Sequence, residues 1–130
     1  MSDFSKSLMV SASGLRAQAI RIQHLSENIS NADTPGYRRK VVSFETQMGM
    51  DRGVAKVSPS RVRLDQTALD EIYDPTHPLA DETGMYQGSN VDLLIELSDA
   101  REAQRSYEAN LKMFEQTRKM STSLMDLLRR

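Results

Sequence analysis

Apolar residues near the N-terminus repeat at a spacing that is typical of an α-helix. Four large ones recur every seven positions and share one helix face: Leu8, Leu15, Ile22 and Ile29. Ala12 and Ala19 lie four residues beyond the first two and continue this stripe, while polar residues at its edges narrow it. The pattern predicts a helix over residues 4–31, with a face that a partner helix can approach closely.

A turn is predicted where this helix ends. Pro35 and Gly36 suit the two central positions of a type II turn, because proline fixes φ and glycine accepts a positive φ. Asn28 and Asn31 precede the turn, and Tyr37 follows it. The chain beyond predicts two short strands and then a polar, turn-rich loop, at residues 37–44, 61–65 and 73–89.

The C-terminal part predicts a second and longer helix, over residues 90–130. Asn90 is the expected N-cap, and Asp92 lies in the first turn, where a carboxylate complements the helix dipole. Apolar residues keep to one face as far as the end of the chain: Leu93, Leu97, Ala100, Tyr107, Leu111, Phe114, Met125 and Leu128. At about 1.5 Å per residue, a helical part of roughly 38 residues would span about 57 Å, and the first helix would span about 42 Å.

These lengths predict a mainly α fold in which one chain cannot cover its own apolar surface. The two terminal helices would form an antiparallel, coiled-coil-like pair, with an irregular middle segment, residues 32–89, on the outside. The 130 residues fit one assembly unit. Past Phe114 the longer helix still carries apolar residues, which another copy or a related subunit would bury. The alternative is a helical hairpin domain whose middle segment covers the exposed end.

Composition excludes several classes of function. The net charge of −1 offers no field that would attract nucleic acid or an anionic membrane. The chain has no cysteine, so it has no disulfide or thiolate chemistry. Its first residues lack the pattern of a cleaved secretory signal, and no stretch is apolar enough for a membrane span. We expect no nucleic-acid binding and no membrane insertion. If the chain is exported, we expect a route that does not use a cleaved secretory signal.

Candidate chemistry is sparse. Asp74 and His77, in a loop with Pro75 and Pro78, could share a catalytic or metal site, but two groups fall short of a zinc ligand set. A rigid turn, in which Asp74 accepts hydrogen bonds from backbone N–H groups, is the favoured interpretation. We therefore predict no catalytic residue, no metal and no cofactor, and we assign this loop to contacts between subunits.

Two further features have ordinary explanations. Arg38, Arg39 and Lys40 form a basic cluster that could touch phosphates, but no aromatic stacking platform accompanies it. A solvated face or ion pairs between subunits are the favoured interpretation. Asn28-Ile29-Ser30 matches the glycosylation sequon, and we discount it because a three-residue pattern occurs often by chance.

Motifs at both ends of the chain resemble the signature of bacterial flagellar rod and hook proteins. They read SASGLRAQ at residues 11–18, NISNADTPGY at residues 28–37 and RSYEAN at residues 105–110. The motif and turn positions of interest are Asn28, Asn31, Pro35, Gly36, Tyr37, Tyr107 and Asn110. Residues 73–80, Gly84 and residues 90–92 are similar to one subfamily of proximal rod proteins. In many members of that subfamily a longer, glycine-rich segment precedes the tyrosine that corresponds to Tyr37. Here residues 34–37 follow the first helix directly, as they commonly do in a sister subfamily, which stays the alternative.

The resemblance implies a structural subunit, and not an enzyme, in the rod of the flagellar basal body, which crosses the periplasm. The terminal helices would form the inner core of the rod, in contact with copies of the chain and with other rod proteins. The flagellar type III apparatus would export the chain unfolded, without a cleaved signal peptide. A flagellar adaptor or chaperone that binds through the same helices is one alternative, and an enzyme that uses Asp74 and His77 is another.

The interface between subunits is expected along both helices. It would consist of large side chains on the two apolar stripes: Leu8, Leu15, Ile22, Ile29, Leu97, Tyr107, Leu111, Phe114, Met125 and Leu128. Side chains of the first helix would pack against those of the second, within one subunit or between two. Asn28, Asn31 and the turn would set the angle at which the chain leaves the first helix. A neighbouring subunit would contact Asp74, Pro75, His77 and Pro78.

Overall fold

The structure is a computed structural model that describes residues 3–49 and 53–129. Two long helices, α1 (Asp3–Ser30) and α2 (Leu93–Leu128), account for more than half of these residues. The part between the helices, as far as it is described, forms short strands: β1 (Lys40–Val41), β2 (Phe44–Met48), β3 (Ala55–Pro59), β4 (Arg63–Leu64), β5 (Glu71–Tyr73) and β6 (Met85–Gln87). The prediction of a mainly α chain with short strands in its middle is confirmed.

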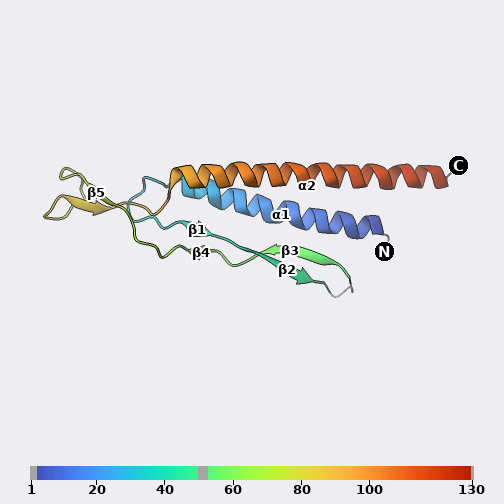
Figure 1. Ribbon diagram of the computed structural model, residues 1–130, viewed down its shortest axis with the longest axis horizontal. Helices are drawn as coiled ribbons and strands as arrows, with labels where there is room; N and C mark the ends of the chain where they lie inside the picture. Colours follow the sequence, from blue (N-terminus) through green and yellow to red (C-terminus); the bar gives the residue numbers. More distant parts are fainter. Residues whose placement is uncertain (1–2, 50–52, 130) are drawn as a thin grey trace.

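The two helices lie side by side and run in opposite directions (Figure 1). The contacts between them reveal this direction, because the residue number falls along α2 as it rises along α1: Gly14 with Asn110, Arg21 with Glu102, and Asn28 with Glu96. We call the end where α1 stops and α2 starts the base of the helix pair. At the other end, α2 extends well beyond the first residues of α1 (Figure 1).

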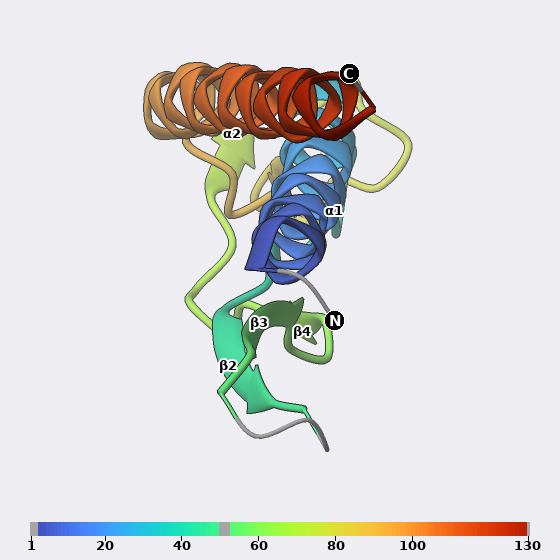
Figure 2. The ribbon, with the colours of Figure 1, turned by 90° about the vertical axis from the view of Figure 1, so that its right-hand side faces the viewer.

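Helix α1 lies between α2 and a two-stranded ribbon. Strands β2 and β3 pair antiparallel, and β3 packs along α1 on the side away from α2 (Figure 2). Strands β1 and β4 pair between this ribbon and the base, and β5 and β6 form a hairpin that projects beyond the base (Figure 1). The molecule is therefore elongated, with the β5–β6 hairpin and the free end of α2 at opposite ends of its long axis.

The structure corrects two predictions. Residues 73–89, predicted as a loop, end β5 and contain β6, and the two strands pair Ile72 with Tyr86. Asn90 is not the N-cap of α2, because the helix begins after Asp92, whose carboxylate accepts a hydrogen bond from the Leu94 N–H at 3.0 Å. The Asn90 side chain instead binds backbone groups of the middle segment.

Among the residues that the structure describes, few side chains are fully buried. The buried apolar ones are Ala17, Leu25, Val54, Val91 and Ala103. Ala12 and Ala19 of the predicted stripe are exposed, because α1 turns Ala17 and Leu25 inward. The largest fully buried side chains are polar, Glu96 and Asn28, so a single chain has only a thin apolar core. In the part described, neither helix has an apolar stretch that could cross a membrane.

Candidate assembly interface

A buried polar cluster joins the two helices at their base. Asn28, near the end of α1, and Glu96, in the first turn of α2, are both 0% exposed. The Asn28 amide donates to Glu96 Oε2 at 3.2 Å and to the Lys40 carbonyl at 3.0 Å. Its Oδ1 accepts from the Lys40 N–H at 2.9 Å and from the Tyr37 hydroxyl at 2.8 Å. All hydrogen-bonding positions of this amide are thus filled, and Asn28 fixes α2 and β1 to the end of α1.

Arg39 neutralises the buried Glu96 carboxylate. Its Nε donates to Glu96 Oε1, and its Nη1 lies 3.3 Å from Asp65 Oδ2. Burial acts to lower the pKa of Arg39, but the hydrogen bonds and charges of Glu96 and Asp65 outweigh burial and raise this pKa. A buried carboxylate without a partner is strongly destabilising, so Arg39 is what allows Glu96 to lie between the helices.

A second ion pair closes the cluster on its solvent side. Lys40 Nζ lies 2.5 Å from Glu27 Oε2, and this hydrogen bond lowers the pKa of Glu27 and raises the pKa of Lys40. Burial raises the pKa of Tyr37, whose hydroxyl binds Asn28. The interpretation of the basic cluster as a solvated face or as ion pairs between subunits is wrong for Arg39 and Lys40, because their acidic partners lie in the same chain.

Asn90 and Arg38 attach the middle segment to this cluster. Asn90 Nδ2 donates to the Asp65 carbonyl at 2.9 Å, and Arg38 Nη1 donates to the same carbonyl at 3.2 Å. Asn90 Oδ1 also accepts from the Arg39 backbone N–H at 2.7 Å. Since the Asn90 amide is engaged in this way, it is not available to cap α2. The segment after β4 is thereby held against the start of α2.

The turn after α1 connects the cluster to the β5–β6 hairpin. Pro35 and Gly36 occupy its central positions, the φ of Gly36 is 75°, and the Tyr37 N–H donates to the Thr34 carbonyl at 3.2 Å. Asn31 Nδ2 donates at 2.8 Å to the carbonyl four residues before it, in the last turn of α1. The turn thus has the geometry of type II, and it places Tyr37 where its hydroxyl reaches the end of α1.

The residues predicted for the interface fall into two groups. Those of α1 and two of α2 are half-buried: Leu8, Leu15, Ile22, Ile29, Tyr107 and Phe114. The others are exposed: Leu97, Leu111, Met125 and Leu128. The fully inward residues of α2 are Glu96 and Ala103, and a Cβ added to Gly14 would stand 3.4 Å from the Asn110 amide. Within one chain, the seam between the helices is therefore narrow and partly polar.

Helix α2 carries a long uncovered apolar surface. Large apolar side chains along it have exposed fractions between 36% and 85%: Leu93, Leu94, Ile95, Leu97, Leu111, Met113, Met120, Leu124, Met125, Leu127 and Leu128. Of the described elements, α1 is the one that packs closely against α2. Residues 122–129 are all exposed, where α2 runs beyond α1 (Figure 1). We call residues 118–129 the α2 tip.

The loop around His77 is a rigid turn. Asp74 Oδ1 accepts from the hydroxyl and the N–H of Thr76, at 2.6 and 3.1 Å, and these bonds lower the pKa of Asp74. His77 stacks on Tyr86 with ring centroids 3.9 Å apart, and its Nδ1 accepts from the Leu79 N–H at 3.1 Å. In the described part of the chain, no group of His, Asp and Glu side chains could hold a metal ion. The bonds of Asp74 match the predicted turn.

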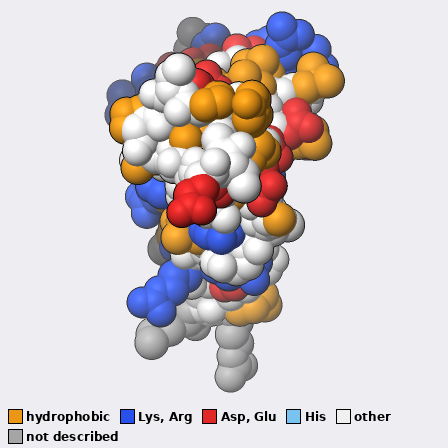
Figure 3. Space-filling view, turned by 90° about the vertical axis from the view of Figure 1, so that its left-hand side faces the viewer, with side chains coloured by type: hydrophobic (Ala, Val, Ile, Leu, Met, Phe, Trp, Pro, Cys, Tyr) orange, Lys and Arg blue, Asp and Glu red, His pale blue; other side chains and the backbone are white. Residues whose placement is uncertain are grey.

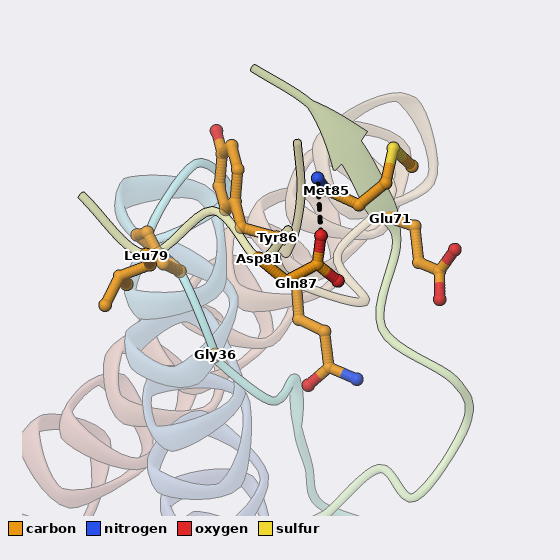
Figure 4. Close-up of a pocket in the computed structure, with 8 residues that line it drawn as sticks. Gly36, Glu71, Leu79, Asp81, Met85, Tyr86 and Gln87 are labelled. Carbon is orange, nitrogen blue, oxygen red and sulfur yellow. Dashed lines mark hydrogen bonds between the residues drawn. The ribbon is translucent and has the colours of Figure 1, made fainter. Parts of the chain in front are cut away.

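A hollow lies between the hairpin and the turn after α1 (Figure 4). Its volume is about 450 Å³, and acidic and apolar side chains line it together: Pro35, Gly36, Glu71, Leu79, Asp81, Met85, Tyr86 and Gln87. The Met85 N–H donates to the Asp81 carboxylate at 3.1 Å, and the Gly36 N–H donates to the Gly88 carbonyl at 3.0 Å. The first bond lies within the hairpin, and the second joins the hairpin to the turn after α1.

The sequence interpretation missed Glu96 and Asp65 as members of the polar cluster. Glu96, Ala103 and Asn110 are spaced by seven residues, so a carboxylate on the inward seam of α2 could have been found from the spacing. Nothing local distinguishes Asp65, whose role depends on its contact with Arg39, far away in sequence. The cluster as a whole positions the helices relative to each other.

Known proteins match nearly the whole length of the chain. The flagellar basal-body rod protein FlgC of Agrobacterium fabrum is 42% identical over 99% of this chain and 98% of its own length. The chain belongs to the FlgC family of flagellar basal-body rod proteins. The FlgC proteins of Aquifex aeolicus and Bacillus subtilis are 34% and 33% identical, over 92% and 93% of this chain and 93% and 95% of their own lengths.

Two family models match the ends of the chain. One described as "Flagella basal body rod protein" matches residues 8–38, and one described as "Flagellar basal body rod FlgEFG protein C-terminal" matches residues 82–127. The relatives named above favour FlgC over the sister rod protein FlgB. As a member of this family the chain is a structural protein and not an enzyme. Asp74 and His77 lie outside both matched segments, whereas Asn28 and Glu96 lie within them.

Proposed function

We propose that the chain is one assembly unit, residues 1–130, of the proximal flagellar rod, and that it polymerises with copies of itself and with other rod proteins into a helical shaft. In that shaft α1 and α2 form an antiparallel, coiled-coil-like core, and the middle segment lies outside. The shaft transmits torque from motor to hook. Membership of a family of basal-body rod proteins supports this role.

The observation that carries the proposal is the uncovered apolar surface of α2. Full burial of one Leu or Met side chain contributes about 1.5 to 3 kcal/mol. Leu124, Met125, Leu127 and Leu128, on the α2 tip, are 46% to 85% exposed, so a neighbour that covers them gains several kcal/mol. Contacts between different faces of identical subunits generate rings or helical filaments. A narrow core with a wide uncovered surface is what a filament subunit requires.

The contacts between subunits would use the two apolar stripes and the hairpin loop. On the helices they are Leu8, Leu15, Ile22, Ile29, Leu97, Tyr107, Leu111, Phe114, Met125 and Leu128. At the hairpin they are Asp74, Pro75, His77 and Pro78. The half-buried members would complete the seam of each helix pair, and the exposed ones would face another subunit.

The proposed location is the rod where it crosses the periplasm. The chain would reach it through the flagellar type III export apparatus, without a cleaved signal peptide. An unfolded chain passes such a channel more easily when no disulfide has to be broken, and this chain has no cysteine.

The test is a charge on the exposed stripe of α2. Leu111→Asp should remove the protein from purified basal bodies and abolish swimming, while the exported fraction stays measurable. Gln116→Asp places the same charge at an exposed polar position of α2 and should behave as wild type. Normal swimming with Leu111→Asp would contradict the proposal. A wild-type chain that is absent from basal bodies but binds soluble flagellar proteins would favour an adaptor or chaperone.

A further inference from the structure

Charge is distributed unevenly along the molecule. Residues 64–100 contain no lysine or arginine but many aspartates and glutamates. They form the end of β4, the β5–β6 hairpin and the start of α2, at one end of the long axis (Figure 1). The α2 tip, at the other end, carries Arg118, Lys119 and Arg129 against the single acidic residue Asp126. Arg39 offsets the charge of two of these carboxylates, those of Asp65 and Glu96, at the base. The excess of acidic residues therefore lies on the hairpin, and the excess of basic residues lies on the α2 tip.

The acidic end also presents apolar side chains and a hollow. Tyr73 and Leu79 are 68% and 64% exposed on the hairpin. Viewed from this end, apolar and acidic side chains lie together over the upper part of the surface (Figure 3). In Figure 4, Leu79 and Glu71 lie on opposite sides of the hollow, with Tyr86 and Asp81 between them. The surface is therefore suited to an apolar ligand that carries positive charge.

The α2 tip has the complementary chemistry. Arg118, Met125 and Arg129 lie at i, i+7 and i+11, so they share one face of the helix. Leu127 and Leu128 beside them are 63% and 85% exposed. α2 has 36 residues and is about 54 Å long at 1.5 Å per residue, so the tip cannot reach the hairpin of its own chain.

We propose that the α2 tip of one copy docks into the hollow on the β5–β6 hairpin of the next copy, in a head-to-tail contact along the long axis. The inference rests on the proposed function, because it names one of the contacts by which copies of the chain would polymerise. The two surfaces lie at opposite ends of the same chain, so each bound copy leaves one of each free. Such a contact extends into an open chain.

Hydrogen bonds inside the hairpin favour the charged form of two of its carboxylates, Asp74 and Asp81. Hydrogen bonds from Thr83 and from the Met85 N–H lower the pKa of Asp81, as those from Thr76 lower that of Asp74. Because both carboxylates accept bonds within the hairpin, they also hold its turns in one conformation. The complementary charges steer the approach of the tip, and burial of apolar side chains stabilises the docked state.

Cysteine crosslinking tests the contact directly, since the natural chain contains no cysteine. Full-length Leu79→Cys chains are mixed with full-length Met125→Cys chains and oxidised. A disulfide forms only where the two Cα atoms come within about 7 Å. The docked contact would bring these two positions together, so disulfide-linked dimers of one Leu79→Cys chain and one Met125→Cys chain should form. Met113→Cys lies on α2 outside the tip, twelve residues or about 18 Å before Met125, and Met113 is similarly exposed at 62%. It serves as the matched control and should give few dimers with Leu79→Cys. Equal yields for the two mixtures would overturn the proposal.

A charge exchange provides a second test that needs no cysteine. Glu71→Lys with Glu82→Lys, or Arg118→Glu with Arg129→Glu, should weaken self-association in sedimentation by about threefold to tenfold. A mixture of the two reversed chains should recover association, because each chain then offers the surface that the other lacks. Failure of either pair to weaken association, or failure of the mixture to recover it, would contradict the head-to-tail contact.

Failure of this inference differs from failure of the proposed function. If the wild-type chain copurifies with basal bodies but the Leu79–Met125 pair does not crosslink, the chain is a rod subunit and the docked contact is wrong. If the chain is absent from basal bodies, the rod function itself is wrong, whatever the crosslinking result.

Discussion

Replacement of Asn28 by alanine tests whether the buried polar cluster holds the helix pair together. Asn28 is 0% exposed and its amide makes four hydrogen bonds, to Glu96, to the Tyr37 hydroxyl and to both backbone groups of Lys40. Alanine removes all four and leaves buried Glu96 with one donor fewer. The change acts where α1, β1 and α2 meet, so it should loosen all three elements.

The magnitude follows from these bonds. A hydrogen bond in a folded protein contributes about 0.5 to 1.5 kcal/mol net, so four contribute about 2 to 6 kcal/mol. Tyr37 and Lys40 are only half-buried, and water can replace part of what they lose. We therefore expect Asn28→Ala to lower the free energy of unfolding by about 2 to 4 kcal/mol. Tyr37→Phe, which removes one of the four bonds, should lower it by about 1 kcal/mol.

Urea unfolding followed by far-ultraviolet circular dichroism measures these changes. Gln23→Ala, at an exposed position of the same helix, is the matched control and should stay within about 0.5 kcal/mol of wild type. The same small change for Asn28→Ala would refute the reasoning, because the cluster would then contribute no more than a surface residue. An unaltered slope of free energy against urea would exclude a difference in the unfolded chain as the cause.

Two further predictions concern the hairpin and the ion pair. Gly84→Ala should make the hairpin sensitive to proteolysis, because φ of Gly84 is 81° and the new Cβ would stand 2.9 Å from the Tyr73 ring. Gly36→Ala is the control: φ of Gly36 is 75° but its Cβ would meet no atom, so the free energy of unfolding should fall only by the backbone strain of about 1 to 2 kcal/mol. Lys40 lowers the pKa of Glu27 from its ordinary 4.5, so the ion pair stabilises the fold above that pH and is lost as Glu27 becomes protonated. The urea midpoint should therefore fall as the pH drops below about 4.5, and it should fall by a smaller amount in Glu27→Gln.

The helices and the turn after α1 could be predicted because their determinants are local. Apolar residues recur every seven positions from Leu8 and in steps of three and four residues along α2. This periodicity predicts a helix from the sequence of the helix alone, without any knowledge of distant contacts. Pro35 and Gly36 likewise fix a type II turn from within the turn itself. The predicted bounds, residues 4–31 and 90–130, differ from Asp3–Ser30 and Leu93–Leu128 by one to three residues at each end that the structure describes.

Strands β3, β5 and β6 and the cap of α2 could not be predicted in the same way. β5 and β6 have three residues each, and they are strands only because the hairpin brings them together. β3 is stabilised by its contact with α1. In this contact the Val57 N–H of β3 donates a hydrogen bond to Ser13 Oγ of α1 at 3.1 Å. Asn90 has the right chemistry for an N-cap, but contacts far away in sequence engage its amide first and leave the cap to Asp92.

The arrangement of side chains on α2 argues against a self-sufficient helical hairpin. A helix that only has to complete such a domain turns its large apolar residues toward its partner and its polar residues toward water. α2 turns Glu96, Ala103 and Asn110 toward α1 and leaves Leu111 and the apolar residues of its tip outside. The middle segment does not cover them, because the β2–β3 ribbon packs on α1 and the β5–β6 hairpin lies beyond the base (Figure 1). Directional hydrogen bonds therefore set the register within one chain, which leaves the apolar surface of α2 uncovered. In the proposed rod, neighbouring molecules would bury that surface.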